Sequence, residues 1–251
     1  MSSVEVLGEQ VQIPVEIRDA RSWFASFLVP LDAARVLVAP AGLEPTLTMR
    51  KFAFATLAFV RYSDGDLGPY QEVAVAVLVD DPTGSGGSNG KRGTGAASAY
   101  IHQLPVNQEF TCAAGREIWG FPKFIADITI TEGRRSDSCD LVHEGRQVLR
   151  LEIGHGMPTP VRDTSLDALS FRDGVLRRTS WSLDGAGSRA RPSGASLELG
   201  EHPIADELRS LGLPHRALMS GSLRRVKMSF SGAEVLSPSA GSSRVEPQGV
   251  G

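Results

Sequence analysis

The sequence predicts an α+β fold that is rich in β-strands and has two or three helices. The first observation is a repeat of two residues over 46–62 and 70–80, in which every second residue falls on the same face, as in a β-strand. The second is that helix signals are limited to short segments at 31–38, 105–120 and 203–211. We expect a single domain over 1–236 and a disordered tail, rich in Ser, Pro and Gly, over 237–251.

Composition and charge argue against several classes of function. The formal net charge is −3 and both signs are mixed along the chain, which argues against a nucleic-acid or membrane-surface partner. Cys112 and Cys139 make neither a disulfide framework nor a zinc ligand set, and none of the five histidines has metal-binding spacing. Because no signal peptide and no apolar stretch of transmembrane length is seen, we expect a soluble cytoplasmic protein.

The first elements come from simple patterns. Alternation over 4–17 predicts a leading strand, and the denser apolar run 22–29 predicts a second one. A short helix then begins at about residue 31 and ends before Pro40.

The two alternating segments are expected to pair as a hairpin, because turn residues separate them at 64–69. On the second strand, valines occupy one face, while Glu72, Ala74 and Ala76 share the other. Glu72 therefore lies at the start of a strand, on a face of small side chains. The simplest interpretation of this residue alone is an exposed glutamate at a strand edge.

The Gly-rich segment 82–95 is similar to a phosphate-binding loop but fails its pattern. Ser85 stands where a glycine is needed, and Arg92 stands where Ser or Thr should follow the lysine. No amphipathic helix follows to hold a phosphate at its N-terminus. We predict a long surface loop, with a lid over a nearby site as the weaker alternative.

The main helix is predicted over 105–120, after a short strand at 97–104. Asn107 is a candidate cap, and Gly120 with Pro122 ends the helix. Lys123 then follows at a rigid joint before a strand over 124–131, and a rigid joint suits a group whose position must be fixed before chemistry.

The rest of the chain is predicted to form mainly short strands. The segment 144–146 is the turn of a predicted hairpin. Further elements are predicted as strands at 166–176, 180–183 and 196–199, a polar Gly-rich loop at 185–196, a helix at 203–211, and closing strands at 217–222 and 226–235.

The strongest chemical candidate is Lys123. Apolar neighbours, among them Trp119, Phe121 and Phe124, crowd this lysine. If they close over the side chain, its amine loses hydration, which favours the neutral, nucleophilic form that attacks ketones and aldehydes. The alternative is a lysine whose stem covers apolar surface while its head reaches water. The chain has neither the Gly-x-Ser-x-Gly of serine hydrolases nor a dinucleotide-binding glycine pattern in the right setting.

Gly-Arg-Glu-Ile at 115–118, followed by Phe-Pro-Lys at 121–123, resembles the active-site segment of the acetoacetate decarboxylase family. The resemblance implies that Lys123 is the Schiff-base lysine. One departure is that Phe124 stands where the best-known decarboxylases have a second lysine. Acetoacetate decarboxylase is a well-known example of a lysine activated by desolvation or by a neighbouring cation, and here the adjacent sequence supplies only the desolvation.

Two further segments extend the resemblance to about residues 13–236. Leu-Gly-Pro-Tyr-Gln-Glu at 67–72 is similar to the family's Leu-Gly-x-Tyr-x-Glu, which implies an active-site role for Glu72. Arg21 begins a segment that resembles an Arg-x-aromatic-Phe whose arginine lines the site. The decarboxylases' second glutamate falls near Leu57 and is absent here.

The resemblance implies a mainly antiparallel fold in a barrel- or cone-like arrangement, a homo-oligomer, and catalysis without a cofactor. We expect Lys123 and Glu72 to be catalytic. Substrate-binding residues are then Arg21, Arg116, Trp119 and Phe121, although Arg116 can equally be a structural part of the helix end.

The expected activity is decarboxylation of acetoacetate or a related β-keto acid through a lysine iminium. An aldolase or aldol-dehydratase would use the same enamine, for example with pyruvate and an aldehyde. A third interpretation is a non-catalytic cavity that binds a hydrophobic small molecule.

Overall fold

The computed structural model describes residues 2–46, 51–83, 97–160 and 164–236. In this part of the chain strands dominate, which confirms the β-rich α+β prediction. The helices are α1 (Leu31–Val38), α2 (Glu109–Trp119) and α3 (Pro203–Ser210), with a 3-10 turn η1 (Ala39–Ala41). Within the described residues, no helix is both long and apolar enough to cross a membrane.

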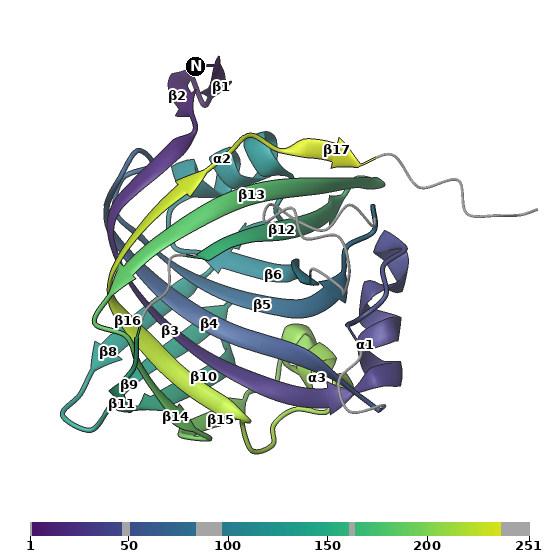
Figure 1. Cartoon of the computed structure of the whole chain (residues 1–251), viewed down its shortest axis with the longest axis vertical. Helices are drawn as coiled ribbons and strands as arrows, with labels where there is room; N and C mark the ends of the chain where they lie inside the picture. Colours follow the sequence, from purple (N-terminus) through teal and green to yellow (C-terminus); the bar gives the residue numbers. More distant parts are fainter. Residues whose placement is uncertain (1, 47–50, 84–96, 161–163, 237–251) are drawn as a thin grey trace, which may run out of the picture.

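Most strands join one large curved sheet, mainly antiparallel, with β6–β12 and β6–β7 as parallel pairs (Figure 1). Because β13 also pairs with β16, the path β16–β3–β4–β5–β6–β12–β13 returns to its first strand. The strands on this path are β3 (Val15–Pro30), β4 (Phe52–Gly65), β5 (Tyr70–Asp80), β6 (Ala97–Val106), β12 (Thr164–Arg172), β13 (Val175–Ala186) and β16 (Met219–Phe230). Shorter members are β7 (Lys123–Ile125), β11 (Met157–Pro158), β14 (Arg189–Pro192) and β17 (Glu234–Leu236).

A second sheet and a hairpin complete the architecture. The second sheet has the order β15–β10–β9–β8, formed by β15 (Ala195–Leu199), β10 (Arg146–Gly154), β9 (Ser136–His143) and β8 (Asp127–Glu132). The hairpin pairs β1 (Ser2–Val6) with β2 (Glu9–Ile13). Figure 1 shows the hairpin projecting at the N-terminal end, with α2 close to β13.

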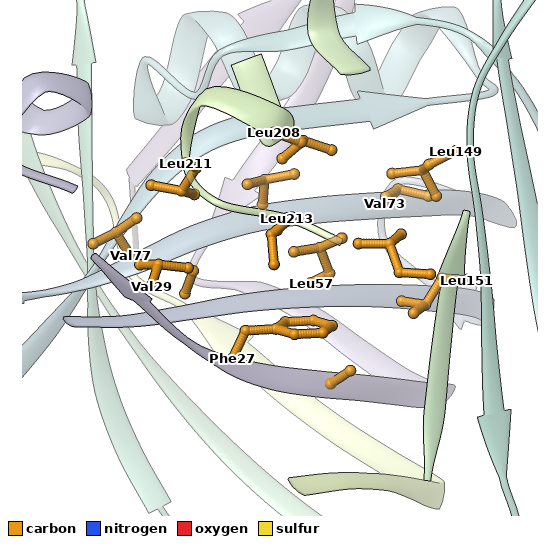
Figure 2. Close-up of a cluster of buried hydrophobic side chains, with 14 of the residues drawn as sticks. Phe27, Val29, Leu57, Val73, Val77, Leu149, Leu151, Leu208, Leu211 and Leu213 are labelled. Carbon is orange, nitrogen blue, oxygen red and sulfur yellow. The ribbon is translucent and has the colours of Figure 1, made fainter. Parts of the chain in front are cut away.

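The main core lies on the outer face of β3, β4 and β5. Phe27, Leu57 and Val73, one from each strand, are almost completely buried. Figure 2 shows them in one cluster with Leu149 and Leu151 of β10, and with leucines from α3 and the segment after it. The second sheet and α3 therefore cover this face, which leaves the other face of the same strands for a different use.

The N-terminal segment differs from the single leading strand predicted over 4–17. The chain turns at Leu7 and Gly8, which have φ angles of 48° and 83°. This left-handed turn splits the segment into β1 and β2, and β3 then begins at Val15. The reason is that alternation alone does not reveal a tight turn when a leucine occupies one of its left-handed positions.

Helix α2 starts later than predicted. Residues 105 and 106 remain in β6, where they pair with β7. The side chain of Gln108 caps the helix by accepting a hydrogen bond from the backbone N–H of Thr111, whereas the Asn107 Oδ1 accepts from the Gln71 backbone N–H at 2.7 Å. Asn107 thus joins β5 to the start of the helix and does not cap it. The predicted short helix α1 is confirmed at Leu31–Val38.

The C-terminal half contains more strand than predicted. A turn at Asp173 and Gly174, both with positive φ, divides the segment predicted as one strand at 166–176 into β12 and β13. The segment 185–196, predicted as a loop, contains the end of β13 and all of β14. The two predicted closing strands at 217–222 and 226–235 instead form β16 and β17, and β16 runs unbroken through a register shift between Leu223 and Val226.

Two predictions fall on residues outside the described ranges. These are the Gly-rich loop at 82–95, of which the structure describes residues 82 and 83, and the tail at 237–251.

Candidate active site

A cavity of about 340 Å³ lies on the inner face of the strands that carry the core on their outer face. Glu72, Ala74 and Ala76 of β5 all line it, as expected for residues that share one face of a strand. Ala58 of β4 and Ala99 of β6 also line the cavity. Because the alanine side chains are small, the strands leave open space that larger side chains would fill.

Lys123 enters this cavity from the joint between α2 and β7. Helix α2 ends at Trp119 and is capped by Gly120, which has a left-handed φ of 64°, and the Phe121 backbone N–H donates to the Gly115 carbonyl at 3.0 Å. Lys123 then pairs with Leu104 of β6 as β7 begins. The helix end and the strand start therefore fix the backbone of Lys123 from both sides.

Gly115 and Arg116 contact Lys123 directly. A Cβ atom on Gly115 would lie 2.4 Å from the Lys123 Cδ, so the lysine stem passes over the helix where no side chain blocks it. The Arg116 Nε donates to the Lys123 carbonyl at 2.6 Å. Arg116 does not line the cavity; it holds the backbone of the lysine from outside.

The Lys123 ammonium lies beside Glu72 in a nearly closed environment. Lys123 and Glu72 are 4% and 7% exposed, and the Nζ atom lies 2.8 Å from the Glu72 Oε2. The Nζ also donates to the Thr111 Oγ1 at 3.3 Å and lies 5.1 Å from the centre of the Tyr70 ring. A buried charge needs such partners, since burial without them is very costly.

Tyr62 connects to this pair through Glu72. Its hydroxyl donates to the Glu72 Oε1 at 2.9 Å, and its ring stacks on Tyr70 with centroids 4.2 Å apart. Burial raises the pKa of Tyr62 well above its usual value, and the charge of Glu72 raises it further. Burial and Glu72 likewise raise the pKa of Tyr70. Both phenols are therefore protonated at neutral pH, so Tyr62 can act as a hydrogen-bond donor.

This arrangement combines a primary amine, a carboxylate and a phenol within hydrogen-bonding distance. Glu72 can accept a proton from the lysine, and Tyr62 stabilises the carboxylate that remains when the proton returns. A neutral lysine amine in an apolar cavity is a nucleophile for carbonyl compounds.

The structure brings most of the predicted site residues together. Trp119 and Phe121 line the cavity near Lys123 and Glu72. The Trp119 Nε1 donates to the Ser231 carbonyl at 2.7 Å, which leaves the indole ring as an apolar wall. Phe124 packs against the His143 ring, with centroids 4.9 Å apart, and does not line the cavity.

Arg21, like Arg116, was predicted to bind substrate and does not line the cavity. Its neighbours Ser22 and Phe24 differ: both line the cavity, whereas Arg21 does not. The Arg21 guanidinium forms an ion pair with Glu132 of β8 and lies 5.2 Å from the Trp23 ring centroid. Because side chains alternate along a strand, Arg21 and Trp23 share the opposite face of β3, so Arg21 does not reach a substrate beside Lys123.

Sequence reasoning missed Tyr62, Tyr70 and Thr111 as members of the site. A signal for the tyrosines was present, because a hairpin that pairs Val60 with Glu72 also pairs Tyr62 with Tyr70. Assigning a register to the predicted hairpin would have placed both rings next to Glu72. No sequence signal identified Thr111, since its contact with Lys123 depends on how α2 meets β7.

A group of possible metal ligands lies elsewhere, at His143, Glu144 and His202. The His202 Nδ1 accepts from the Ile204 backbone N–H at 3.1 Å and caps α3, so its Nε2 carries the proton toward the His143 Nδ1, 3.2 Å away. Both nitrogens of His202 are thus in use. The contacts assign this group a structural role at the start of α3.

The sequence matches the family model for acetoacetate decarboxylase (ADC) over residues 8–239. No curated protein matches the sequence.

Several solved structures are similar in fold. One is the acetoacetate decarboxylase from Legionella pneumophila subsp. pneumophila str. Philadelphia 1, with a TM-score of 0.68, 16% identity and 91% of each chain covered. A second is the enduracididine biosynthesis enzyme MppR complexed with pyruvate, with a TM-score of 0.68, 16% identity, and 95% of this chain and 99% of that chain covered. A third is an acetoacetate decarboxylase-like enzyme from Sphingomonas wittichii RW1, with a TM-score of 0.56, 15% identity, and 92% and 96% covered. The match to the family model extends over most of the sequence, and the chain belongs to the acetoacetate decarboxylase family.

Proposed function

We propose that this protein is a carbon–carbon lyase that forms a Schiff base through Lys123 and decarboxylates acetoacetate or a related β-keto acid. The observation that carries the proposal is the position of the Lys123 Nζ, which is buried in a mostly apolar cavity 2.8 Å from the Glu72 Oε2. Membership of the acetoacetate decarboxylase family supports the reaction type.

The reaction begins with a proton transfer from the Lys123 ammonium to Glu72. The neutral amine attacks the ketone carbon, and loss of water gives an iminium, which attracts electrons from the neighbouring carbon atoms. The bond between the α-carbon and the carboxylate then breaks. Its electron pair moves toward the iminium to give an enamine, and carbon dioxide leaves. Protonation of the enamine carbon and hydrolysis release the ketone and free the lysine.

Glu72 transfers protons in this scheme, and Tyr62 orients Glu72. Glu72 is the one carboxyl group that lines the cavity among the described residues, so it takes the ammonium proton before attack and delivers it to the hydroxyl that leaves as water. After carbon dioxide has left, Glu72 passes a second proton, taken up from solvent water, to the enamine carbon. Tyr62 donates its hydroxyl proton to Glu72 in a hydrogen bond at 2.9 Å and orients the carboxylate. The apolar walls favour release of carbon dioxide, since a carboxylate is costly to hold in apolar surroundings and carbon dioxide is neutral.

Aldol chemistry is the second candidate, and one observation favours it. The Glu72 carboxylate stands 2.8 Å from the imine nitrogen position, where it can also remove a proton from the carbon next to the iminium. The resulting enamine would attack an aldehyde. Structures of MppR contain pyruvate in one case and the condensation product of pyruvate and imidazole 4-carboxaldehyde in another.

Borohydride trapping tests the proposal. The protein is incubated with acetoacetate or with pyruvate, reduced, and examined by intact mass and peptide mapping. The chain has four lysines, Lys51, Lys91, Lys123 and Lys227, so the modified site is easily assigned. We expect an adduct on Lys123, none on the exposed Lys227, and none on the peptide of a Lys123→Met variant. Carbon dioxide release from acetoacetate would identify the decarboxylase, and a condensation product from pyruvate plus an aldehyde would identify the aldolase.

Absence of an adduct on Lys123 with either acid would contradict the Schiff-base proposal. The remaining interpretation would be a cavity that binds an apolar small molecule without catalysis. Lys227→Arg is the matched control, because it removes an exposed lysine of β16 and should leave trapping and turnover unchanged.

We also propose that the closed path of strand pairings is the barrel- or cone-like arrangement expected for the family, and that the protein assembles as a homo-oligomer. Light scattering after size-exclusion chromatography measures the assembly directly, and a monomeric mass across the accessible concentration range would contradict it.

A further inference from the structure

The walls of the cavity are poorly suited to a second charged group on the substrate. Among the described residues, Lys123 and Glu72 are the charged side chains that line it, and they are paired with each other. The hydroxyl of Thr56, which also lines the cavity, is within 3.0 Å of the Ser26 hydroxyl, so it already has a partner. An ionised group on the substrate, other than the carboxylate that leaves as carbon dioxide, would therefore stay buried without an opposite charge throughout the reaction, which is very costly.

Four aromatic side chains that contact one another line the cavity. Trp181 of β13 and Phe230 of β16 stack with centroids 5.7 Å apart and planes at 11°. Trp119 lies against Phe230 with centroids 5.8 Å apart, and Phe121, two residues before Lys123, lies 5.8 Å from Trp119. These rings form an apolar surface that extends from the β13–β16 pair toward Phe121, near Lys123. Such a surface suits aryl and alkyl groups.

Elsewhere the cavity is open because several of its lining side chains are alanines. Ala58 pairs with Ala74 across β4 and β5, and Ala99 pairs with Ala168 across β6 and β12. The resulting space, about 340 Å³, is within the range of pockets that hold drug-sized ligands and exceeds what acetoacetate needs. Unfilled apolar space is unfavourable in a protein interior, so a site of this size is explained by a ligand that fills it.

We propose that the carbonyl substrate carries a large, uncharged apolar group, an aryl ring or a medium-length alkyl chain, which occupies the space between the aromatic rings and the alanines. The inference rests on the proposed Schiff-base role of Lys123 and specifies the substrate class for that site. In a β-keto acid of this class, the carboxylate leaves as carbon dioxide, and the apolar group remains in the cavity throughout the reaction.

A series of methyl ketones tests the substrate class independently of the reaction that follows. Acetone, 2-pentanone, 2-heptanone and 4-phenyl-2-butanone each form an imine with loss of water, and borohydride reduces it to a stable secondary amine. We measure the ketone concentration that gives half-maximal labelling of Lys123. It should fall about fourfold for each added methylene that enters the cavity, from the free energy of burying a CH₂ group. Labelling of the exposed Lys227 in the same samples should show no such gradient.

An Ala76→Phe variant fills the cavity from β5 and should flatten the gradient, so that the larger ketones lose their advantage over acetone. Ala76→Val makes a smaller intrusion and serves if the phenylalanine disturbs folding. Ala39→Phe is the matched control, because it adds the same side chain at an exposed position of η1 and should keep the wild-type gradient.

The outcomes separate the two proposals. Equal half-maximal concentrations for acetone and 2-heptanone on Lys123 would overturn the substrate class and leave the Schiff-base function standing. If no ketone labels Lys123, both are overturned. A gradient that persists unchanged in the Ala76 variants would also overturn the assignment, since the apolar group would then bind elsewhere.

Discussion

The two faces of strands β4 and β5 differ in role: the outer face forms the hydrophobic core, and the inner face lines the cavity. On the outer face, Leu57, Phe59 and the valines of β5 are buried against the second sheet and α3 (Figure 2). On the inner face, alanines leave a cavity, and Glu72 pairs with Lys123. Alternation along a strand therefore lets every second residue stabilise the fold while the residues between them form the site.

The strongest consequence is expected for a mutation that disrupts the packing of the outer face. Leu57 is fully buried, and Leu57→Ala should lower the free energy of unfolding by about 2–5 kcal/mol, because it removes apolar contacts and leaves a void. Denaturant unfolding measures the loss. Below the transition, borohydride labelling of Lys123 should match wild type. Leu57→Met, which conserves volume, should cost less than about 1.5 kcal/mol. If folded Leu57→Ala protein also lost labelling of Lys123, the outer face would be needed for the chemistry of the inner face.

Gly115→Ala tests how closely the inner face positions the amine. The new Cβ would lie 2.4 Å from the Lys123 Cδ, so the lysine stem must move and carry the Nζ away from Glu72. We expect turnover to fall by about a hundredfold while the thermal midpoint changes little, since small displacements of a reacting group cost on the order of 10²-fold. Glu117→Ala, an exposed change on the same helix, is the control. Wild-type turnover in Gly115→Ala would show that the close approach is not needed.

Tyr62→Phe removes the hydrogen bond to Glu72 and keeps the ring that stacks on Tyr70. A hydrogen bond to a charged group is worth about 1.5–3 kcal/mol, so kcat should fall by about tenfold to a hundredfold. Tyr100→Phe removes a hydroxyl on the outer face of β6 and should leave kcat unchanged. Equal kinetic effects of the two changes would argue against a specific role of Tyr62.

The smallest effect concerns the outer layer at α3, whose cap is His202. Burial lowers the pKa of His202 below its usual value, and Arg146 lowers it further. The unfolded chain therefore binds a proton more readily, with an ordinary histidine pKa of about 6.5. This contribution to stability is complete above about pH 6.5 and decreases as the pH falls below it.

His202→Asn keeps a capping oxygen and removes the titrating group. The loss of thermal stability between about pH 7 and about pH 5 should become shallower than in wild type, while trapping at Lys123 stays the same. A pH dependence identical to wild type would show that other groups dominate.

The candidate site was predictable where neighbours in sequence decide it. Gly120 and Pro122 end a helix by local backbone rules, so the joint that carries Lys123 could be predicted from residues within a few positions. The face shared by Glu72 and the alanines followed from alternation. Arg21 could not be placed in the same way, because its motif does not reveal which face of β3 turns toward the cavity.

Local sequence patterns were enough to predict the β-rich class, the short helices, the two-faced strands of the β4–β5 hairpin and the lysine at the end of α2. Periodicity and turn residues specify these features locally. Three features became visible only in the folded protein: β13 pairs with β16, Tyr62 and Thr111 contact the Lys123–Glu72 pair, and Arg21 pairs with Glu132 outside the cavity. These contacts join residues far apart in the chain, so they depend on strand register and packing, which no local pattern encodes.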